Sequence, residues 1–200
     1  FDTIGIASVD SGSNTMTLAA DTAFAIRPGD RYYVQGHREE LDAPGEWYLD
    51  QTASKFYFWP PAPLAAGTAV MVPTLQTIIQ VGTATSQITI QGFDIEYCAG
   101  TAVSMYPDAT DCLIVGCVIR NAGGSGVQID GGLRNGVAGC DISEVGFHGV
   151  SISGGDRKTL VPAGNFADNN YIHHVDVFHR HCSGDRKSTR LNSSHATLSR

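Results

Sequence analysis

Three stretches of the sequence align with one another and decide the fold: residues 87–106 (QITIQGFDIEYCAGTAVSMY), 112–130 (CLIVGCVIRNAGGSGVQID) and 136–153 (GVAGCDISEVGFHGVSIS). Three sets of apolar residues then correspond, at spacings of 24 and 23 residues: Ile90, Ile114 and Val137; Ile95, Ile119 and Ile142; and Val103, Val127 and Val150. A fourth copy begins at residues 165–174 (NFADNNYIHH), after an interruption of the period. The chain from about residue 75 onward is therefore a repeat of short apolar runs.

The repeat predicts an all-β fold, a right-handed parallel β-helix. Each repeat supplies three short strands, and equivalent residues of successive coils then stack about 4.8 Å apart. One predicted inward column, in which Cys fills space and Asn ladders its amide, is Phe93, Cys117, Cys140 and Asn170. The main alternative is a leucine-rich repeat, which requires Leu-rich units and a helical segment in each. We expect about four coils of a truncated β-helix over residues 74–184.

Residues 1–73 have a different pattern, in which short alternating runs are separated by turn sequences such as DSGSN and RPGD. They predict a small β-sandwich-like insertion domain, with a truncated start. Residues 41–50 (LDAPGEWYLD) and 55–61 (KFYFWPP) predict an aromatic-rich hairpin. Its aromatic side chains form either a sugar-stacking surface or part of a core, and the alternation favours the core.

The charge of the chain limits its partners. The net charge is −7, from 13 Lys and Arg against 20 Asp and Glu. Residues 185–200 hold four of those basic and one of those acidic residues, which leaves 9 − 19 = −10 for the rest. This balance argues against nucleic acid and anionic membranes as partners. Five Cys without a CxxC pair predict neither a zinc site nor a disulfide framework, and we expect no metal and no cofactor.

The alternation of the strands predicts outward columns that suit an extended polymer. The first contains Asp94, Val118, Asp141 and Tyr171, the second Glu96, Arg120, Ser143 and His173, and the third Tyr106, Asp130 and Ser153. Asp94 and Asp141, two coils apart, are expected to lie roughly 9–10 Å from each other, near the upper end of the acid–base separation in inverting glycosidases. We assign both to substrate binding and Asp130 to catalysis. The simpler alternative is that these acidic residues only solvate the strand faces, and that Glu96 and Arg120 form a surface ion pair.

The insertion GGDRKTLVPAGN, residues 154–165, interrupts the coil period, and loops of this kind are frequent functional positions. Within it, Asp156 is a candidate acid or base and Arg157 a candidate clamp for substrate hydroxyl or carboxylate groups; alternatively, both only pin the loop. His148, in the turn sequence GFHGV, is a further candidate catalytic residue. His173 and His174 are adjacent on a strand, so at most one of them is expected to face any site.

Three of these stretches together carry a family resemblance: LDAPGEWYLD with YFWPP, ITIQGFDIEYCAGTAVSM, and GVSISGGDRKTLVPAGNFADNNYIHH. They resemble bacterial right-handed β-helix proteins related to glycoside hydrolase family 141, in which a β-sandwich insertion interrupts the β-helix. The resemblance covers about residues 30–180. It implies a carbohydrate-active protein, a glycoside hydrolase acting on plant or other complex polysaccharide. Asp156 and Arg157 match a recurrent loop of that group, and the resemblance assigns them no role.

The resemblance further implies a polysaccharide or oligosaccharide partner and a secreted, periplasmic or cell-surface location. Two alternatives share the fold. A polysaccharide lyase or epimerase requires a base and a cationic group to neutralise a uronate, which the net charge disfavours. A non-catalytic carbohydrate-binding or adhesive surface requires neither.

The end of the chain, DRKSTRLNSSHATLSR at residues 185–200, differs from everything before it because it is basic and contains no Gly. It resembles one reading frame of a common short-read sequencing adapter. We therefore expect residues 185–200 to be a non-native, disordered tail and exclude them from the argument on function.

Overall fold

A computed structural model describes residues 3–156, 158–178 and 185–187 of the chain. The chain divides between Val70 and Met71 into two compact units, close to the predicted boundary after residue 73.

The first unit, up to Val70, contains two separate two-stranded antiparallel sheets. Strands β1 (Ile6–Asp10) and β2 (Thr15–Leu18) form one sheet, β3 (Trp47–Asp50) and β4 (Lys55–Phe58) form the other, and η1 (Arg38–Glu40) is a short 3₁₀ turn between them in sequence. None of the residues 3–70 is buried. Where a β-sandwich-like unit was predicted, the structure thus has two hairpins without a shared core.

The aromatic hairpin is confirmed, with Trp47 opposite Phe58 and Asp50 opposite Lys55. The prediction that its aromatic side chains form a core is wrong, because Trp47 is 59% exposed and Phe56 and Trp59 are also exposed. A two-stranded sheet without an opposing layer leaves both of its faces open to solvent.

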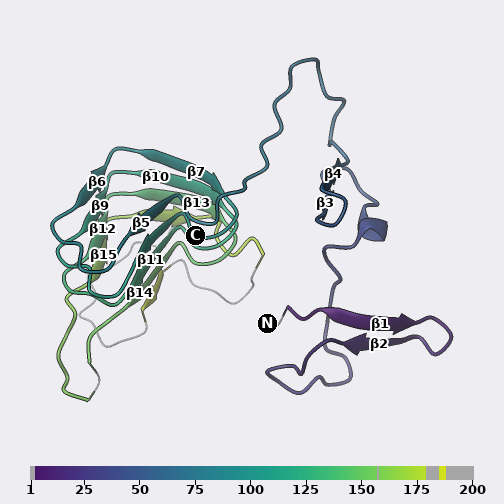
Figure 1. The fold of residues 1–200 in the computed structure, drawn as a ribbon, viewed down its shortest axis with the longest axis horizontal. Helices are drawn as coiled ribbons and strands as arrows, with labels where there is room; N and C mark the ends of the chain where they lie inside the picture. Colours follow the sequence, from purple (N-terminus) through teal and green to yellow (C-terminus); the bar gives the residue numbers. More distant parts are fainter. Residues whose placement is uncertain (1–2, 157, 179–184, 188–200) are drawn as a thin grey trace. The chain divides into compact units, whose positions relative to one another are not determined.

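The second unit is a parallel β-helix of about three turns, built from three parallel sheets (Figure 1). Sheet 1 contains β7 (Asp94–Cys98), β10 (Val118–Ala122), β13 (Asp141–Val145) and β16 (Tyr171–His173). Sheet 2 contains β5 (Ile79–Val81), β8 (Val103–Met105), β11 (Val127–Asp130), β14 (Val150–Ser153) and β17 (Asp185–Lys187). Sheet 3 contains β6 (Thr89–Gln91), β9 (Leu113–Val115), β12 (Gly136–Ala138) and β15 (Phe166–Asp168). The chain passes from sheet 3 to sheet 1 to sheet 2 in every turn, which confirms the predicted fold class.

The register of the coils confirms the sequence alignment. Ile114 pairs with Ile90 and Val137, Ile119 with Ile95 and Ile142, and Val127 with Val103 and Val150. All of these residues except Ile90 are buried, and they form the continuous core of the β-helix. The insertion, residues 154–165, lies between β14 and β15 and projects from the coils (Figure 1).

The predicted inward column is correct in part. Cys117, Cys140 and Asn170 are buried, and Asn170 accepts a hydrogen bond from the Cys140 N–H at 2.9 Å and donates one to the Val137 carbonyl at 2.9 Å. Phe93 is 58% exposed, contrary to the prediction. Phe93 lies between β6 and β7, which begin their sheets, so a neighbouring coil covers it on one side only.

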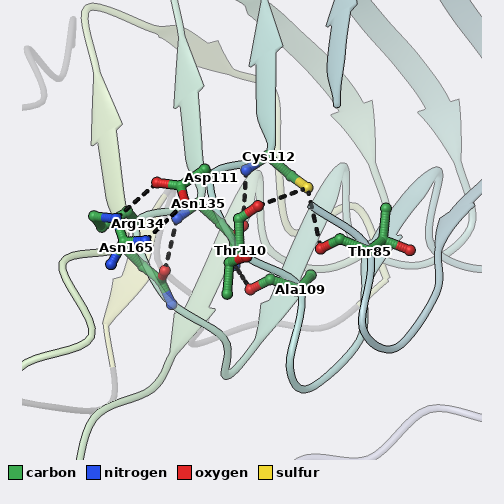
Figure 2. Close-up of polar contacts among 8 residues, drawn as sticks. All are labelled: Thr85, Ala109, Thr110, Asp111, Cys112, Arg134, Asn135 and Asn165. Atoms are coloured by element: carbon green, nitrogen blue, oxygen red, sulfur yellow. Dashed lines mark hydrogen bonds and ion pairs between the residues drawn. The ribbon is translucent and has the colours of Figure 1, made fainter. Parts of the chain in front are cut away.

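A second buried column stands at the turn between sheet 2 and sheet 3 (Figure 2). Asn135 accepts a hydrogen bond from the Cys112 N–H at 3.0 Å and donates one to the Ala109 carbonyl at 2.8 Å. Asn165 in turn accepts from the Asn135 N–H at 2.9 Å. Asn135 is therefore the acceptor for the buried Cys112 N–H, whereas the Ala109 carbonyl also accepts from the Leu133 N–H.

Strand β17 pairs with β14 through residues 185–187, where the sequence predicted a disordered tail. The free edge of β14 has unpaired backbone N–H and C=O groups. A strand can pair with such an edge through its backbone, whatever its side chains are. Residues 188–200 lie outside the described residues, so the non-native origin of the tail stays a prediction.

Candidate functional site

The outward face of sheet 2 carries a continuous column of uncharged polar side chains. The in-register pairs of β5, β8, β11 and β14 place four residues in it: Gln80, Ser104, Gln128 and Ser151. Each is more exposed than its strand neighbours, because the flanking Val, Ile and Met side chains point into the core. The face therefore offers one amide or hydroxyl group per coil, at intervals of about 4.8 Å.

A shorter column runs beside it, at the ends of the same strands. Asp130 pairs with Ser153, and the exposed Tyr106 directly follows β8 at the equivalent position of the preceding coil. Gln128 donates a hydrogen bond to the Asp130 carboxylate at 2.7 Å, and Gln80 donates to the Tyr106 hydroxyl at 3.4 Å. These bonds join the two columns into one polar surface, which we call the sheet 2 face.

A shallow depression of about 370 Å³ lies at the turn from sheet 2 toward sheet 3. Its lining comes from two coil turns and the insertion: Asp108, Thr110, Gly132, Leu133, Gly155, Asp156 and Val161. Tyr106 and Asp130 each precede one of these turns directly in the chain. The structure thus brings the predicted residues Asp130 and Asp156 to the same part of the β-helix.

Asp156 is held by its own loop. Its carboxylate accepts hydrogen bonds from the Thr159 hydroxyl and the Lys158 N–H, each at 2.8 Å, and its backbone bridges to Val161. The bond from Thr159, followed by that from Lys158, holds the pKa of the Asp156 carboxyl below its ordinary value. Asp156 is therefore ionised at neutral pH, which suits a base or a hydrogen-bond acceptor better than an acid. Arg157 lies outside the described residues.

The other predicted carboxylates lie on a different sheet. Asp94 and Asp141 both point outward from sheet 1 and both pair with Val118, so they stand two coils apart, as predicted. The Glu96–Arg120 ion pair on the same sheet is confirmed, with two nitrogen–oxygen distances of 3.1 and 3.2 Å. Sheet 1 and the depression are separate parts of the surface, so the structure does not gather the predicted residues into one site.

His148 is buried, with 3% of its surface exposed, and its ring packs on Phe147 at a centroid distance of 4.0 Å. It lies between β13 and β14, in the corner that joins sheet 1 to sheet 2. In this position it is shielded from a polymer that lies on either face.

The prediction for the adjacent histidines is wrong, because both face the same site. The Nδ1 atoms of His173 and His174 lie 2.7 Å apart on the outside of sheet 1. His174 has a left-handed backbone (φ 48°), and a residue in this conformation breaks the alternation of a strand. Three residues at the equivalent positions of the preceding coils share this conformation: Tyr97, Asn121 and Glu144.

The two histidines form a chain of contacts with two carboxylates. His173 Nε2 lies 3.1 Å from the Asp141 carboxylate, and His174 Nδ1 lies 3.8 Å from that of Glu144. No group of three or more His, Cys, Asp or Glu side chains among the described residues is arranged to hold a metal ion.

Comparison with known proteins identifies the family of the chain and shows that its β-helix is right-handed. Residues 77–172 and 102–195 match a family described as right handed beta helix region. The chain belongs to this family. No curated protein and no solved structure matches the chain. Right-handed β-helix regions are common in polysaccharide-acting enzymes and in adhesins, and no helix among the described residues of this one is long and apolar enough to span a membrane.

The sequence of this β-helix contains a signal for the His pair that alternation alone misses. In these strands of sheet 1, a buried Ile is followed three positions later by the next apolar side chain that points into the core: Ile95 by Cys98, Ile119 by Ala122 and Ile142 by Val145. A regular strand repeats every two residues, so the extra residue marks an irregular position in every coil. That position is His174 in the last described coil of sheet 1.

Proposed function

We propose that this β-helix binds polysaccharide or oligosaccharide along its sheet 2 face. The protein is then a glycoside hydrolase that acts on plant or other complex polysaccharide outside the cell, whether secreted, periplasmic or at the cell surface. One observation carries the proposal: the sheet 2 strands that hold the column of amide and hydroxyl groups are followed by the turns that line a depression with ionised Asp156.

The chemistry of the sheet 2 face suits a neutral polymer. Its column of Gln and Ser side chains offers donors and acceptors for sugar hydroxyl groups without a net charge. Tyr106, with its exposed ring, adds a surface on which a sugar ring can stack. Because these groups recur with every coil, an extended chain of repeating sugars can meet equivalent partners along its length.

Hydrolysis requires two carboxyl groups in different protonation states. Asp156 supplies the ionised one, because the hydrogen bonds from Thr159 and Lys158 lower its pKa. The proton donor of a glycosidase has a raised pKa, which the lowered pKa of Asp156 does not suit. We therefore assign binding to the sheet 2 face and propose Asp156 as the ionised carboxylate of the pair.

The test uses the soluble polymers xylan and pectin together with fucosylated oligosaccharides. Gln128→Ala and Tyr106→Ala are expected to weaken binding of the recognised sugar by roughly threefold to tenfold each, from the loss of one hydrogen bond or one stacking surface. Gln91→Ala, which removes an exposed amide from sheet 3, is the matched control and is expected to bind like the wild type.

Isothermal titration calorimetry measures the binding, and reducing-end assays measure the release of sugar. Binding without release favours a carbohydrate-binding or adhesive protein over a hydrolase. Unsaturated products favour a lyase. Wild-type protein that binds none of the three sugars, or variants that all bind equally, would contradict the assignment of the sheet 2 face.

A further inference from the structure

The depression beside the insertion extends across several coils. Three of its lining residues come from equivalent places in successive coils: Asp108, Gly132 and Gly155. Each is the third residue after an in-register position of β8, β11 and β14. All three have a left-handed backbone, with φ angles of 71°, 69° and 78°. The depression therefore runs in the direction in which the strands stack.

Of these three equivalent residues, Asp108 is the one that carries a side chain. Gly132 and Gly155 have none, so they leave the middle of the depression unfilled. Asp108 borders the depression in the first of the three coils, and Asp156, directly after Gly155, borders it beside the third. Two strand spacings separate these coils, so the backbones of the two aspartates lie roughly 9–10 Å apart along the stack. The depression thus has a carboxyl group toward each end and open space between them.

This arrangement suits an inverting glycosidase. Such an enzyme keeps its two carboxyl groups about 6.5–9.5 Å apart, so that a water molecule fits between the sugar and the base. A retaining enzyme needs them closer, at about 5–5.5 Å. The lining also offers Leu133, which is 40% exposed, as an apolar surface and Thr110 as a hydroxyl group. Both are suitable partners for a sugar ring that lies between the carboxyl groups.

Neighbouring carboxyl groups are less suitable partners for Asp156. Asp130 accepts a hydrogen bond on the sheet 2 face and is outside the lining of the depression. The Asp111 carboxylate is engaged by Arg134, with two nitrogen–oxygen distances of 2.7 Å, and is outside the lining as well. Among the described residues, Asp108 is therefore the carboxyl group that shares the depression with Asp156.

We propose that Asp108 is the proton donor of the hydrolase and that the reaction inverts the anomeric carbon. The inference rests on the proposed function, because it assigns the second carboxyl group of the same site. A water molecule attacks the anomeric carbon and gives one proton to the Asp156 carboxylate. The bond between the anomeric carbon and the glycosidic oxygen breaks, and Asp108 donates its proton to that oxygen. Water is the only co-reactant.

The leaving group distinguishes a proton donor from a base. Dinitrophenolate leaves as a stable anion, so dinitrophenyl xyloside and dinitrophenyl fucoside require the base but not the proton donor. Asp108→Asn is expected to lower the rate on xylan or fucosylated oligosaccharide by about 100-fold or more, and the rate on the matching dinitrophenyl glycoside by less than about threefold. Asp156→Asn is expected to lower both rates by about 100-fold or more. Proton NMR of the first product is expected to show the inverted anomer.

Asn is the appropriate replacement because it tolerates the left-handed backbone of Asp108. Asp111→Asn is the matched control, since Asp111 follows the same strand, is also left-handed (φ 56°) and loses only a surface ion pair. This control is expected to cleave both kinds of substrate like the wild type. Folded Asp108→Asn protein, as judged by circular dichroism, that keeps the wild-type rate on both substrates or loses both equally would overturn the proton donor. Retention of the anomer would overturn inversion.

Binding of a cationic sugar mimic tests the carboxyl pair without turnover. Iminosugars of xylose and fucose configuration carry a positive ring nitrogen, which imitates the charge that develops on the sugar in the transition state. Asp108→Asn and Asp156→Asn are each expected to weaken iminosugar binding in calorimetry by about threefold to tenfold, and Asp111→Asn to leave it unchanged. Wild-type protein that cleaves no substrate would overturn the hydrolase and with it the proton donor. Iminosugar binding that depends on Asp156 but not on Asp108 would overturn the pair alone.

Discussion

Asn135→Ala is expected to lower the free energy of unfolding of the β-helix by about 2–4 kcal/mol, because the buried Cys112 N–H loses its acceptor, while the Ala109 carbonyl keeps the hydrogen bond from the Leu133 N–H. Asn135 is fully buried; its side chain accepts from the Cys112 N–H and donates to the Ala109 carbonyl. An Ala methyl group replaces neither bond, and it leaves a cavity at the turn between sheet 2 and sheet 3 as well. Urea unfolding followed by circular dichroism measures the change.

Two further variants make the Asn135 prediction specific. Gln91→Ala removes an exposed amide and is expected to leave the unfolding midpoint close to that of the wild type. Asn135→Asp keeps an acceptor for Cys112 but faces the Ala109 carbonyl with a second oxygen. Burial raises the pKa of such a carboxyl group in the folded state, so its destabilisation is expected to be smaller at pH 4 than at pH 7. A loss for Asn135→Ala no larger than that for Gln91→Ala would contradict the structural role of the column.

The register of the β-helix could be predicted from the sequence because a single period controls it. Once Ile95, Ile119 and Ile142 are aligned, every neighbouring strand follows, since a shift by one residue would turn the apolar side chains outward. The Asn135 column follows the same period, because Cys112 and Asn135 are 23 residues apart. The insertion lengthens the next spacing by seven residues, so that Asn165 follows Asn135 after 30 residues. Because the insertion changes this spacing, a search for a constant period in the sequence does not align Asn165 with Asn135.

The candidate sites were harder to predict because they depend on departures from regular strand geometry. The convergence of His173 and His174 requires the left-handed backbone at His174, which simple alternation does not contain. The position and ionisation of the Asp156 carboxylate depend on how the insertion folds back, through the bonds from Lys158 and Thr159. The sheet 2 face, by contrast, follows from the register, because Gln80, Ser104 and Gln128 alternate with core residues.

Close approach between coils, rather than backbone conformation, explains one glycine of the repeat. Gly123 follows β10 at the corner between sheet 1 and sheet 2, and its N–H donates to the Cys98 carbonyl at 2.9 Å. A Cβ atom at this position would lie 2.3 Å from the Ala99 carbonyl oxygen of the preceding coil. The contact is with backbone, so no side-chain rotation relieves it, and the hydrogen bond between the two coils must lengthen.

Gly123→Ala is therefore expected to lower the free energy of unfolding by about 3 kcal/mol or more, at the upper end of the range for overpacking. Gly82→Ala is the matched control, because the nearest atom to its added Cβ is the Thr85 hydroxyl oxygen at 3.8 Å. Gly82 is also exposed, so its replacement is expected to change stability little. Chemical denaturation of the two variants under identical conditions measures the difference. Equal effects of the two substitutions would contradict the prediction. They would mean that the coils move apart at this corner at little cost and are not held in close contact there.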